Sequence, residues 1–190
     1  MHNIRWHRRY IMGELHDFEK EKLIIGVIYS DVEVYCDAIK MLIDKFGPID
    51  AESERFSFSS EFSTYYDGEL GGEGQRVILS FRDNVDASEQ AEIKTFTNSI
   101  EAKFSVAGNR KINLDPGFIN HGRLMLATTK NAGFRIPLSK GIYTELTLFW
   151  ARGGWQKLPW TYRDYQSPKV QKFITEVRKK YLSERKNKTQ

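Results

Sequence analysis

Residues 22–29 read Lys-Leu-Ile-Ile-Gly-Val-Ile-Tyr, a nearly unbroken run of apolar and β-branched side chains. Such a run is typical of a strand that is covered on both faces, because a half-exposed strand alternates apolar with polar residues. A chain of 190 residues can bury a core around this strand without disulfides or a metal. We therefore predict that residues 22–29 form a central strand of a sheet.

Three longer segments have the spacing of amphipathic helices. Asp31 offers an N-cap oxygen to residues 32–46, where apolar side chains recur at helical intervals before Gly-Pro ends the pattern. Residues 86–104 begin with a capping-box-like pair and continue with the same spacing. Ser167 precedes a proline and a third such segment, residues 168–181, whose other face is basic.

The remaining elements are shorter and less regular. Further strands are predicted at residues 56–60, 76–81, 110–115, 134–138 and 142–150, with the last two joined as a hairpin through Ser139-Lys140-Gly141. The glycine-rich part of 51–75 is predicted to be a mobile loop, Asp115-Pro116-Gly117 a turn, and the segment around 124–130 a short helix.

These elements predict one α+β domain, a single sandwich with a mixed or mostly antiparallel sheet and helices packed against it. We expect an N-terminal arm over residues 1–20, disordered in part, the folded domain over 21–181, and a basic tail over 182–190. Met12 is the expected biological start. The predicted core includes Ile25, Val27, Ile39, Ile78, Leu79, Phe96, Ile112, Leu146 and Phe173.

Cysteine content and apolar runs indicate a cytoplasmic protein. Cys36 is the sole cysteine, so the chain has no intramolecular disulfide, and a reducing compartment is the simplest location. We expect Cys36 to be a small core or boundary thiol rather than a nucleophile. No apolar run approaches the length of a membrane helix or of a signal peptide, so no membrane association is expected.

The positive charge of the chain is concentrated at its two ends. Residues 1–11 carry three arginines and no acid, and residues 176–190 carry six basic and two acidic residues. The body, 12–175, has 20 basic and 23 acidic residues and is mildly acidic. A nucleic-acid partner is therefore favoured only through the ends of the chain.

Sequence motifs of several enzyme classes are missing. The chain has no G-x-x-x-x-G-K-[ST] phosphate loop, no G-x-S-x-G or H-E-x-x-H, and no G-x-G-x-x-G in dinucleotide context. The glycines of 68–74 lack the Lys-Ser/Thr pair and precede a strand. The histidines are scattered, and His121 is expected at a helix start on the surface.

A cluster of polar residues near the strand ends is the predicted site. Asp115, Glu145 and Lys130 are the candidate catalytic residues. The candidate ligand-binding residues are Asn113, Arg135, Tyr143, Thr128, Thr129 and Tyr65. We expect the ligand to be a small anion such as a nucleotide or a sugar phosphate, held in a polar cleft.

Two interpretations of the carboxylates remain open. Asp115 and Glu145 are the candidate metal ligands, and Mg²⁺ is the expected ion if they hold one against a phosphate. Alternatively, Glu145 is a structural acid paired with Lys130 or Arg135, because an acid within a long strand is costly to bury alone, and Asp115 only forms a turn.

A second functional interpretation involves the C-terminal part of the chain. Four aromatic residues with interleaved cations follow Trp150 within residues 151–165. Together with a terminal helix carrying Lys179, Lys180, Arg185 and Lys186, they would form an RNA- or protein-interaction module. The plainer alternative is that the aromatic rings cover the edge of the sheet.

Several motifs together resemble one protein family. They are KINLDPGF at residues 111–118, LATTK at 126–130, KGIYTELTL at 140–148, WTYRDYQS at 160–167 and FGPID at 46–50. The chain resembles the bacterial domain of unknown function 4416 family over about residues 21–181. The resemblance implies a cytosolic bacterial protein, and some relatives carry the name GTP-binding protein. That name has no support in this sequence, which lacks both the phosphate loop and an N-K-x-D motif.

Overall fold

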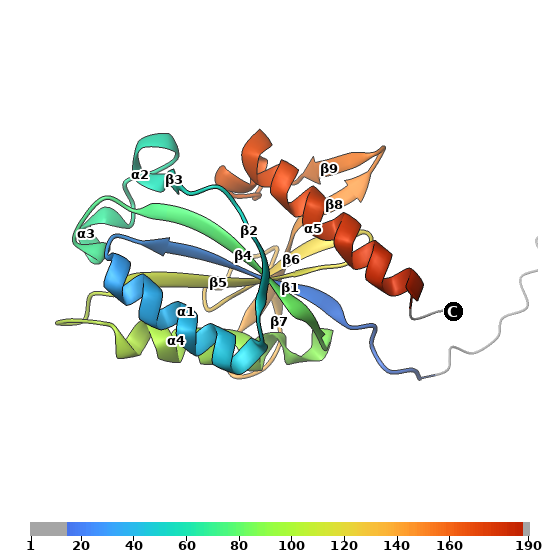
Figure 1. The fold of residues 1–190 in the computed structure, drawn as a ribbon, viewed down its shortest axis with the longest axis horizontal. Helices are drawn as coiled ribbons and strands as arrows, with labels where there is room; N and C mark the ends of the chain where they lie inside the picture. The colour runs from blue at the N-terminus through green and yellow to red at the C-terminus, as the bar shows by residue number, and fades with distance from the viewer. Residues whose placement is uncertain (1–14, 188–190) are drawn as a thin grey trace, which may run out of the picture.

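The predicted central strand is β1 (Glu21–Tyr29), which lies inside a nine-stranded antiparallel sheet (Figure 1). The computed structural model describes residues 15–187. The strand order is β2-β4-β1-β5-β6-β8-β7, with β3 paired to β4 and β9 paired to β8. The other strands are β2 (Ile49–Glu52), β3 (Phe56–Ser57), β4 (Gln75–Val85), β5 (Ile112–Ile119), β6 (Arg123–Thr128), β7 (Ile136–Pro137), β8 (Tyr143–Ala151) and β9 (Gly154–Lys157).

Helices cover both faces of this sheet. The helices are α1 (Val32–Phe46), α2 (Phe58–Glu61), α3 (Asp67–Leu70), α4 (Gln90–Lys103) and α5 (Pro168–Asn187), with 3-10 turns η1 (Ala87–Glu89) and η2 (Asp164–Gln166). Leu23, Ile25 and Val27 of β1 pack with α1 and α4, whereas Ile24 packs with α5. Successive residues of a strand point to opposite faces, so the predicted α+β sandwich is confirmed as three layers.

Most of the predicted core is buried as expected. Ile25, Val27, Ile78, Leu79, Ile112 and Phe173 are buried. Ile39, Phe96 and Leu146 are only partly buried. Cys36, expected in or beside the core, is exposed, because Tyr35 and Ala38 occupy the buried side of α1. That expectation was wrong.

Two local predictions around β5 and β6 were wrong. The segment expected as a short helix is β6, in which Leu124 and Leu126 are buried and the intervening Met125 is not, the alternation of a strand. The expected Asp-Pro-Gly turn lies inside β5. Its Gly117 is required by packing, because a Cβ there would lie 2.8 Å from Leu126 Cδ2. His121 lies in the connection between the two strands and not at a helix start.

Predictions at the ends and in the 51–75 segment had mixed outcomes. The strand expected over residues 56–60 was partly wrong, because β3 ends at Ser57 and the one-turn helix α2 follows at once. The expected glycine-rich loop contains the one-turn helix α3. Helix α5 continues to Asn187, into the segment expected as a basic tail. The expectations for Met12 and for the first part of the N-terminal arm lie outside the described residues. Of residues 15–187, no helix is both long enough and apolar enough to cross a bilayer.

An ion-pair cluster fastens α5 to the sheet. Lys22 of β1 is fully buried, and its Nζ lies 2.8 Å from Asp50 Oδ2 and 3.0 Å from Glu184 Oε1. Lys180 of α5 lies 3.0 Å from the same Asp50 oxygen. Burial by itself would raise the pKa of Asp50, but the hydrogen bonds from Lys22 and Lys180 outweigh it and hold that pKa below its ordinary value.

This cluster predicts an acid-sensitive contribution to stability. A carboxyl with a lowered pKa in the folded state stabilises the fold at neutral pH, and the contribution is lost as the pH falls through that lowered pKa, below about pH 4. Asp50→Asn should therefore show a shallower fall in the free energy of unfolding than wild type between about pH 5 and pH 2. Urea denaturation across that range measures the slopes, with the exposed Asp44→Asn on α1 as the control. Parallel curves for wild type and Asp50→Asn would contradict the assignment.

Candidate functional site

The sheet splits between β5 and β6, and the candidate site lies at this split. β5 pairs with β1 along its whole length, but it pairs with β6 only at Gly117, Phe118 and Ile119. The first half of β5 therefore has one edge without a neighbouring strand. Backbone groups on such an edge need other partners when they are buried.

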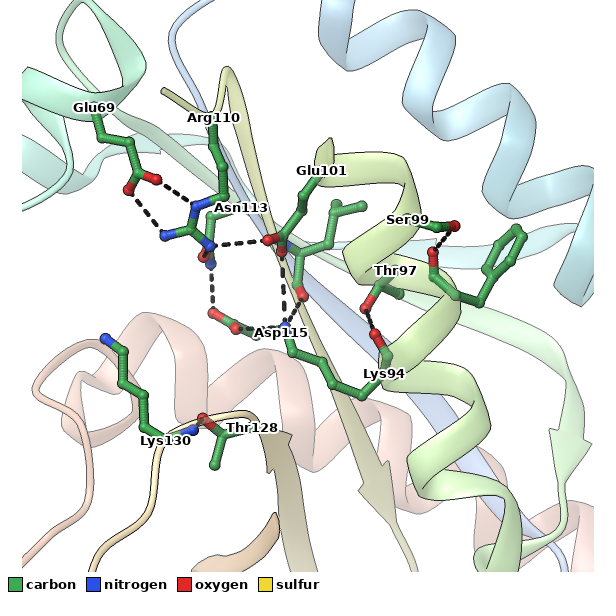
Figure 2. Close-up of polar contacts among 12 residues, drawn as sticks. Glu69, Lys94, Thr97, Ser99, Glu101, Arg110, Asn113, Asp115, Thr128 and Lys130 are labelled. Carbon is green, nitrogen blue, oxygen red and sulfur yellow. Dashed lines mark hydrogen bonds and ion pairs between the residues drawn. The ribbon is translucent and has the colours of Figure 1, made fainter. Parts of the chain in front are cut away.

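Two side chains of α4 take the place of the missing strand. Lys94 Nζ donates to the Leu114 carbonyl oxygen at 2.7 Å, and Glu101 Oε1 accepts from the Leu114 N–H at 2.7 Å. Figure 2 shows both side chains extending from α4 toward Asp115. The two side chains are themselves an ion pair at 3.7 Å and are nearly fully buried. They satisfy the open edge of β5 while leaving space beside it.

That space is a cavity of about 240 Å³. Its charged lining residues are Arg76, Lys94, Arg110 and Lys130 on the basic side, and Glu101, Asp115, Glu145 and Asp164 on the acidic side. Asn98, Asn113, Thr128, Thr129 and the tyrosines 66, 162 and 165 add polar groups, and Ile28, Phe58, Leu126 and Ala127 complete the wall. The lining is therefore polar and charged with both signs.

Arg76 of β4 forms the floor of the cavity. Its side chain is 2% exposed, and its Nη2 lies 3.0 Å from Asp164 Oδ2. The guanidinium also lies 5.5 Å from the centre of the Tyr165 ring. Gly26 of β1 makes room for it, because a Cβ at that position would lie 2.6 Å from Nη2.

Electrostatics keep Arg76 charged in spite of its burial. Desolvation by itself would lower its pKa, but Asp164, Tyr165 and Asp115 outweigh this effect and raise the pKa above its ordinary value. Burial raises the pKa of Asp164, and Arg76 offsets part of that increase. The pair is thus a buried charge with its counter-ion. Nε and Nη1 of Arg76 make no hydrogen bond to any described residue.

Asp115 of β5 lies at the centre of the site. Its Oδ2 accepts a hydrogen bond from Asn113 Nδ2 at 2.7 Å and lies 4.0 Å from Arg76 Nη1. Its Oδ1 lies 3.5 Å from Lys94 Nζ. The side chain is about one-third exposed, whereas Glu101 beside it is buried. Asp115 is therefore a carboxylate that remains open to the cavity.

Arg110 closes one end of the cluster. Its Nε and Nη2 donate to the two carboxylate oxygens of Glu69 at 2.5 and 2.9 Å, and its Nη1 donates to Glu101 Oε2 and Asn113 Oδ1, both at 2.9 Å (Figure 2). The hydrogen bonds to Glu69 and Glu101 raise the pKa of Arg110. This fork ties α3, α4 and β5 together.

Glu145 of β8 forms the opposite wall. It is 1% exposed, and its Oε2 accepts from Arg135 Nε at 2.7 Å. Burial raises the pKa of Glu145, and Arg135 offsets part of the increase. Arg135 Nη2 also donates to the Tyr162 hydroxyl at 2.9 Å. Burial and the nearby Glu145 raise the pKa of Tyr162 to about 12, so this phenol is neutral at physiological pH.

Lys130 is the exposed cation of the lining. It follows β6, and its Nζ lies 5.3 Å from the centre of the Tyr65 ring, a cation–π contact. Its backbone N–H donates to Thr128 Oγ1 at 3.2 Å. Figure 2 shows Lys130 and Thr128 on the side of the cluster away from α4. Thr129 lies between them and is exposed.

The structure brings most of the predicted residues together. Asn113, Asp115, Thr128, Thr129, Lys130 and Glu145 all line the cavity. Arg135 does not line the cavity itself but binds three residues that do, Glu145, Tyr162 and Lys130. Tyr65 likewise contacts the lining residues Lys130 and Tyr66. Tyr143 does not line it, although it lies in β8 two residues before Glu145. The predicted link from Lys130 to a helix end was wrong, because the preceding element is a strand.

Four buried charged residues of the site were missed. Arg76 begins an apolar strand, and Lys94 and Glu101 lie in an otherwise ordinary amphipathic helix. Asp164 lies in η2 within the Trp-rich segment. Lys94 and Glu101 each follow an apolar residue of α4, Ile93 and Ile100, and this position beside the apolar side chains was the one signal in the sequence.

The carboxylates proposed as metal ligands are both engaged by cations. Glu145 is bound by Arg135, and Asp115 lies beside Lys94 and Arg76. Within residues 15–187, no three acidic, histidine or cysteine side chains are grouped as a metal would require. A Mg²⁺ ion at this site would therefore need oxygen ligands from a bound phosphate.

The basic face of α5 is partly neutralised. Lys180 pairs with Asp50, and Arg185 Nη2 lies 2.6 Å from Glu19 Oε1. Arg178 lies over Trp150, with its guanidinium carbon 3.9 Å from the ring centre, a cation–π contact. Trp155 packs in the core beneath α5. The Trp-rich segment thus contributes to the packing of α5 on the sheet.

Comparisons with known proteins identify one family. A family model described as "Domain of unknown function (DUF4416)" matches residues 19–181, most of the chain. No curated protein and no solved structure matched the chain.

Proposed function

The chain belongs to the DUF4416 family, whose description names no activity, and we propose from the site that it binds a small phosphate-bearing anion, such as a nucleotide or a sugar phosphate. The binding site in this proposal is the cavity at the split between β5 and β6. The observation that carries the proposal is Arg76. A fully buried guanidinium lines the cavity with two nitrogens that make no hydrogen bond to any described residue.

Unpaired polar groups are rare in buried positions because each costs free energy. An oxyanion at Arg76 Nη1 would remove that cost and would gain a charge-assisted hydrogen bond. Lys130, exposed in the lining, would neutralise further phosphate oxygens without losing an existing ion pair to a described carboxylate. In this proposal Arg76 binds the anion at the buried end of the cavity, and Lys130 binds it at the exposed end.

The carboxylates have different roles in this proposal. Asp115, open to the cavity, contacts the ligand directly as a hydrogen-bond or proton acceptor or as a Mg²⁺ ligand. Glu145 is buried and is held by Arg135, so Arg135 acts by orienting Glu145 rather than by contacting the ligand. Thr128 and Thr129 offer hydroxyl groups at the rim.

Ligand binding should raise the thermal stability of the protein and should depend on Lys130. A ligand at 100 times its Kd stabilises a fold by about 2.7 kcal/mol, which a thermal-shift screen of nucleotides and sugar phosphates, with and without Mg²⁺, will detect. Lys130→Gln should weaken binding by about tenfold, the loss of one charge-assisted contact. Lys157→Gln, at an exposed lysine outside the cavity, is the matched control. No stabilisation by any phosphate, in wild type or in the control, would overturn the proposal.

We also propose a cytoplasmic location in bacterial cells. The thiol of Cys36 is free and exposed, which suits a reducing compartment, where exposed thiols persist. Fractionation of a bacterium that carries the gene, followed by immunoblotting, tests the location. Recovery of the protein outside the cytoplasmic fraction would contradict it.

A further inference from the structure

The hydrogen bonds already present in the site define which groups remain for a ligand. Lys94 Nζ donates a hydrogen bond to the Leu114 carbonyl oxygen and lies at ion-pair distance from Glu101, 3.7 Å, and from Asp115, 3.5 Å. Glu101 is bound by the Leu114 N–H, Lys94 and Arg110. The groups left over are Arg76 Nε and Nη1 as donors, and Asp115 Oδ1, which has the 3.5 Å contact to Lys94, as an acceptor.

A donor without a hydrogen bond thus lies beside the Asp115 carboxylate. Arg76 Nη1 is 4.0 Å from Asp115 Oδ2, the oxygen that accepts from Asn113, and Oδ1 is the second oxygen of the same group. A phosphate oxygen hydrogen-bonded to Nη1, at about 2.8 Å, would be a close neighbour of this carboxylate. Two anionic oxygens at such a distance repel each other, whereas a hydroxyl group placed between them donates to the carboxylate.

We infer that the ligand is a compact hydroxylated phosphate, a sugar or polyol phosphate, whose phosphate contacts Arg76 and whose neighbouring hydroxyl donates to Asp115. This inference rests on the proposed function and chooses between the two ligand classes named there. It also assigns Asp115 a specificity role: the residue accepts phosphates that carry a nearby hydroxyl and disfavours those that do not.

The size and shape of the cavity favour the same class. Its volume of about 240 Å³ lies below the range of about 300–1,000 Å³ that is usual for drug-sized ligands. The rings that line the cavity are engaged with protein groups. Phe58 and Tyr66 pack edge to face, the Tyr162 hydroxyl is bound by Arg135, and the Tyr165 ring lies 5.5 Å from the Arg76 guanidinium. A polyol phosphate fits these limits, and a nucleoside triphosphate exceeds them.

Matched pairs of phosphates test the inference on the wild-type protein. Glycerol 3-phosphate and n-propyl phosphate share a carbon skeleton, as do inositol 1-phosphate and cyclohexyl phosphate, and only the first of each pair has hydroxyl groups. Calorimetric titration should give a Kd at least about tenfold lower for the hydroxylated member of at least one pair, the worth of a hydrogen bond to a charged group. GTP should bind more weakly than that compound.

An Asp115→Asn variant tests whether Asp115 accepts the hydrogen bond from the ligand hydroxyl. The amide cannot repel a phosphate and accepts a hydroxyl more weakly, so the variant should bind the hydroxylated phosphate more weakly and the hydroxyl-free phosphate more tightly than wild type. Asp44→Asn, the same change at an exposed site on α1, should alter neither Kd. If circular dichroism shows that Asp115→Asn is unfolded, the matched pairs in the wild-type protein still decide.

The outcomes separate this inference from the proposed function. Equal binding of both members in both pairs, or tighter binding of GTP than of every polyol phosphate, would overturn the inference and leave the phosphate site in place. Absence of binding by all of these phosphates, including GTP, would overturn the proposed function and the inference with it.

Discussion

Replacement of Asp164 by alanine should lower the free energy of unfolding by about 3–5 kcal/mol, because it removes the nearest counter-ion of the buried Arg76 charge. Both side chains are nearly fully buried, and their contact distance is 3.0 Å. The Arg76 side chain is 2% exposed and lies against Gly26 and the Tyr165 ring, and its other acidic neighbour, Asp115, is further away, at 4.0 Å. Urea denaturation followed by circular dichroism measures the loss.

Removing both charges provides the control for this prediction. The double variant Arg76→Met with Asp164→Leu replaces the ion pair by apolar side chains and should be more stable than Asp164→Ala alone. A loss below about 1 kcal/mol for Asp164→Ala would mean that water or Asp115 compensates the Arg76 charge fully, which contradicts its dependence on Asp164. The same result would remove the main support for an anion site at Arg76.

Glu101→Ala should cost about 3 kcal/mol or more, because Glu101 satisfies a buried backbone group that has no strand partner. The change leaves the Leu114 N–H without its 2.7 Å acceptor and removes a carboxylate from Lys94 and Arg110. The open edge of β5 then loses one of the two side chains that stand in for a strand. Urea denaturation measures this loss too.

Glu101→Gln separates the two contributions. Its amide oxygen can still accept from the Leu114 N–H, while the negative charge is lost, so its cost should fall between those of wild type and Glu101→Ala. Equal stability of wild type and Glu101→Ala would show that water or another group satisfies the edge of β5. In that case the split in the sheet would not depend on α4.

Long periodic segments were predictable because their pattern reflects local geometry. Each pattern depends on which side chains of an element face the core. This holds for the apolar run of β1, for the helical spacing of α1, and for the alternation of Ile112 and Leu114 with Asn113 and Asp115. In the strand predicted over residues 110–115, Asn113 and Asp115 are two positions apart and so share a face, and both are residues of the site. The side chains line the cavity as that alternation required.

The errors occur where neighbours outweigh local preference. Residues 124–127 are too few to distinguish a strand from a helix by spacing, and pairing with β8 decides the matter. Asp115-Pro116-Gly117 has the composition of a turn. It stays extended because β1 pairs with it on one side and because Gly117 lies tightly against Leu126 and Ile24.

The sequence by itself determined the central strand, the three long helices, the family and the candidates Asp115, Lys130 and Glu145, because binary pattern and motif spacing are properties of neighbouring residues. Only the tertiary structure decided that β5 and β6 separate and that Lys94 and Glu101 satisfy the open edge. It also placed Arg76, in β4, against Asp164, 88 positions further along the chain. Pairing between residues so far apart depends on the packing of the whole sheet, and it is this packing that turns separate polar residues into a cavity with a buried cation.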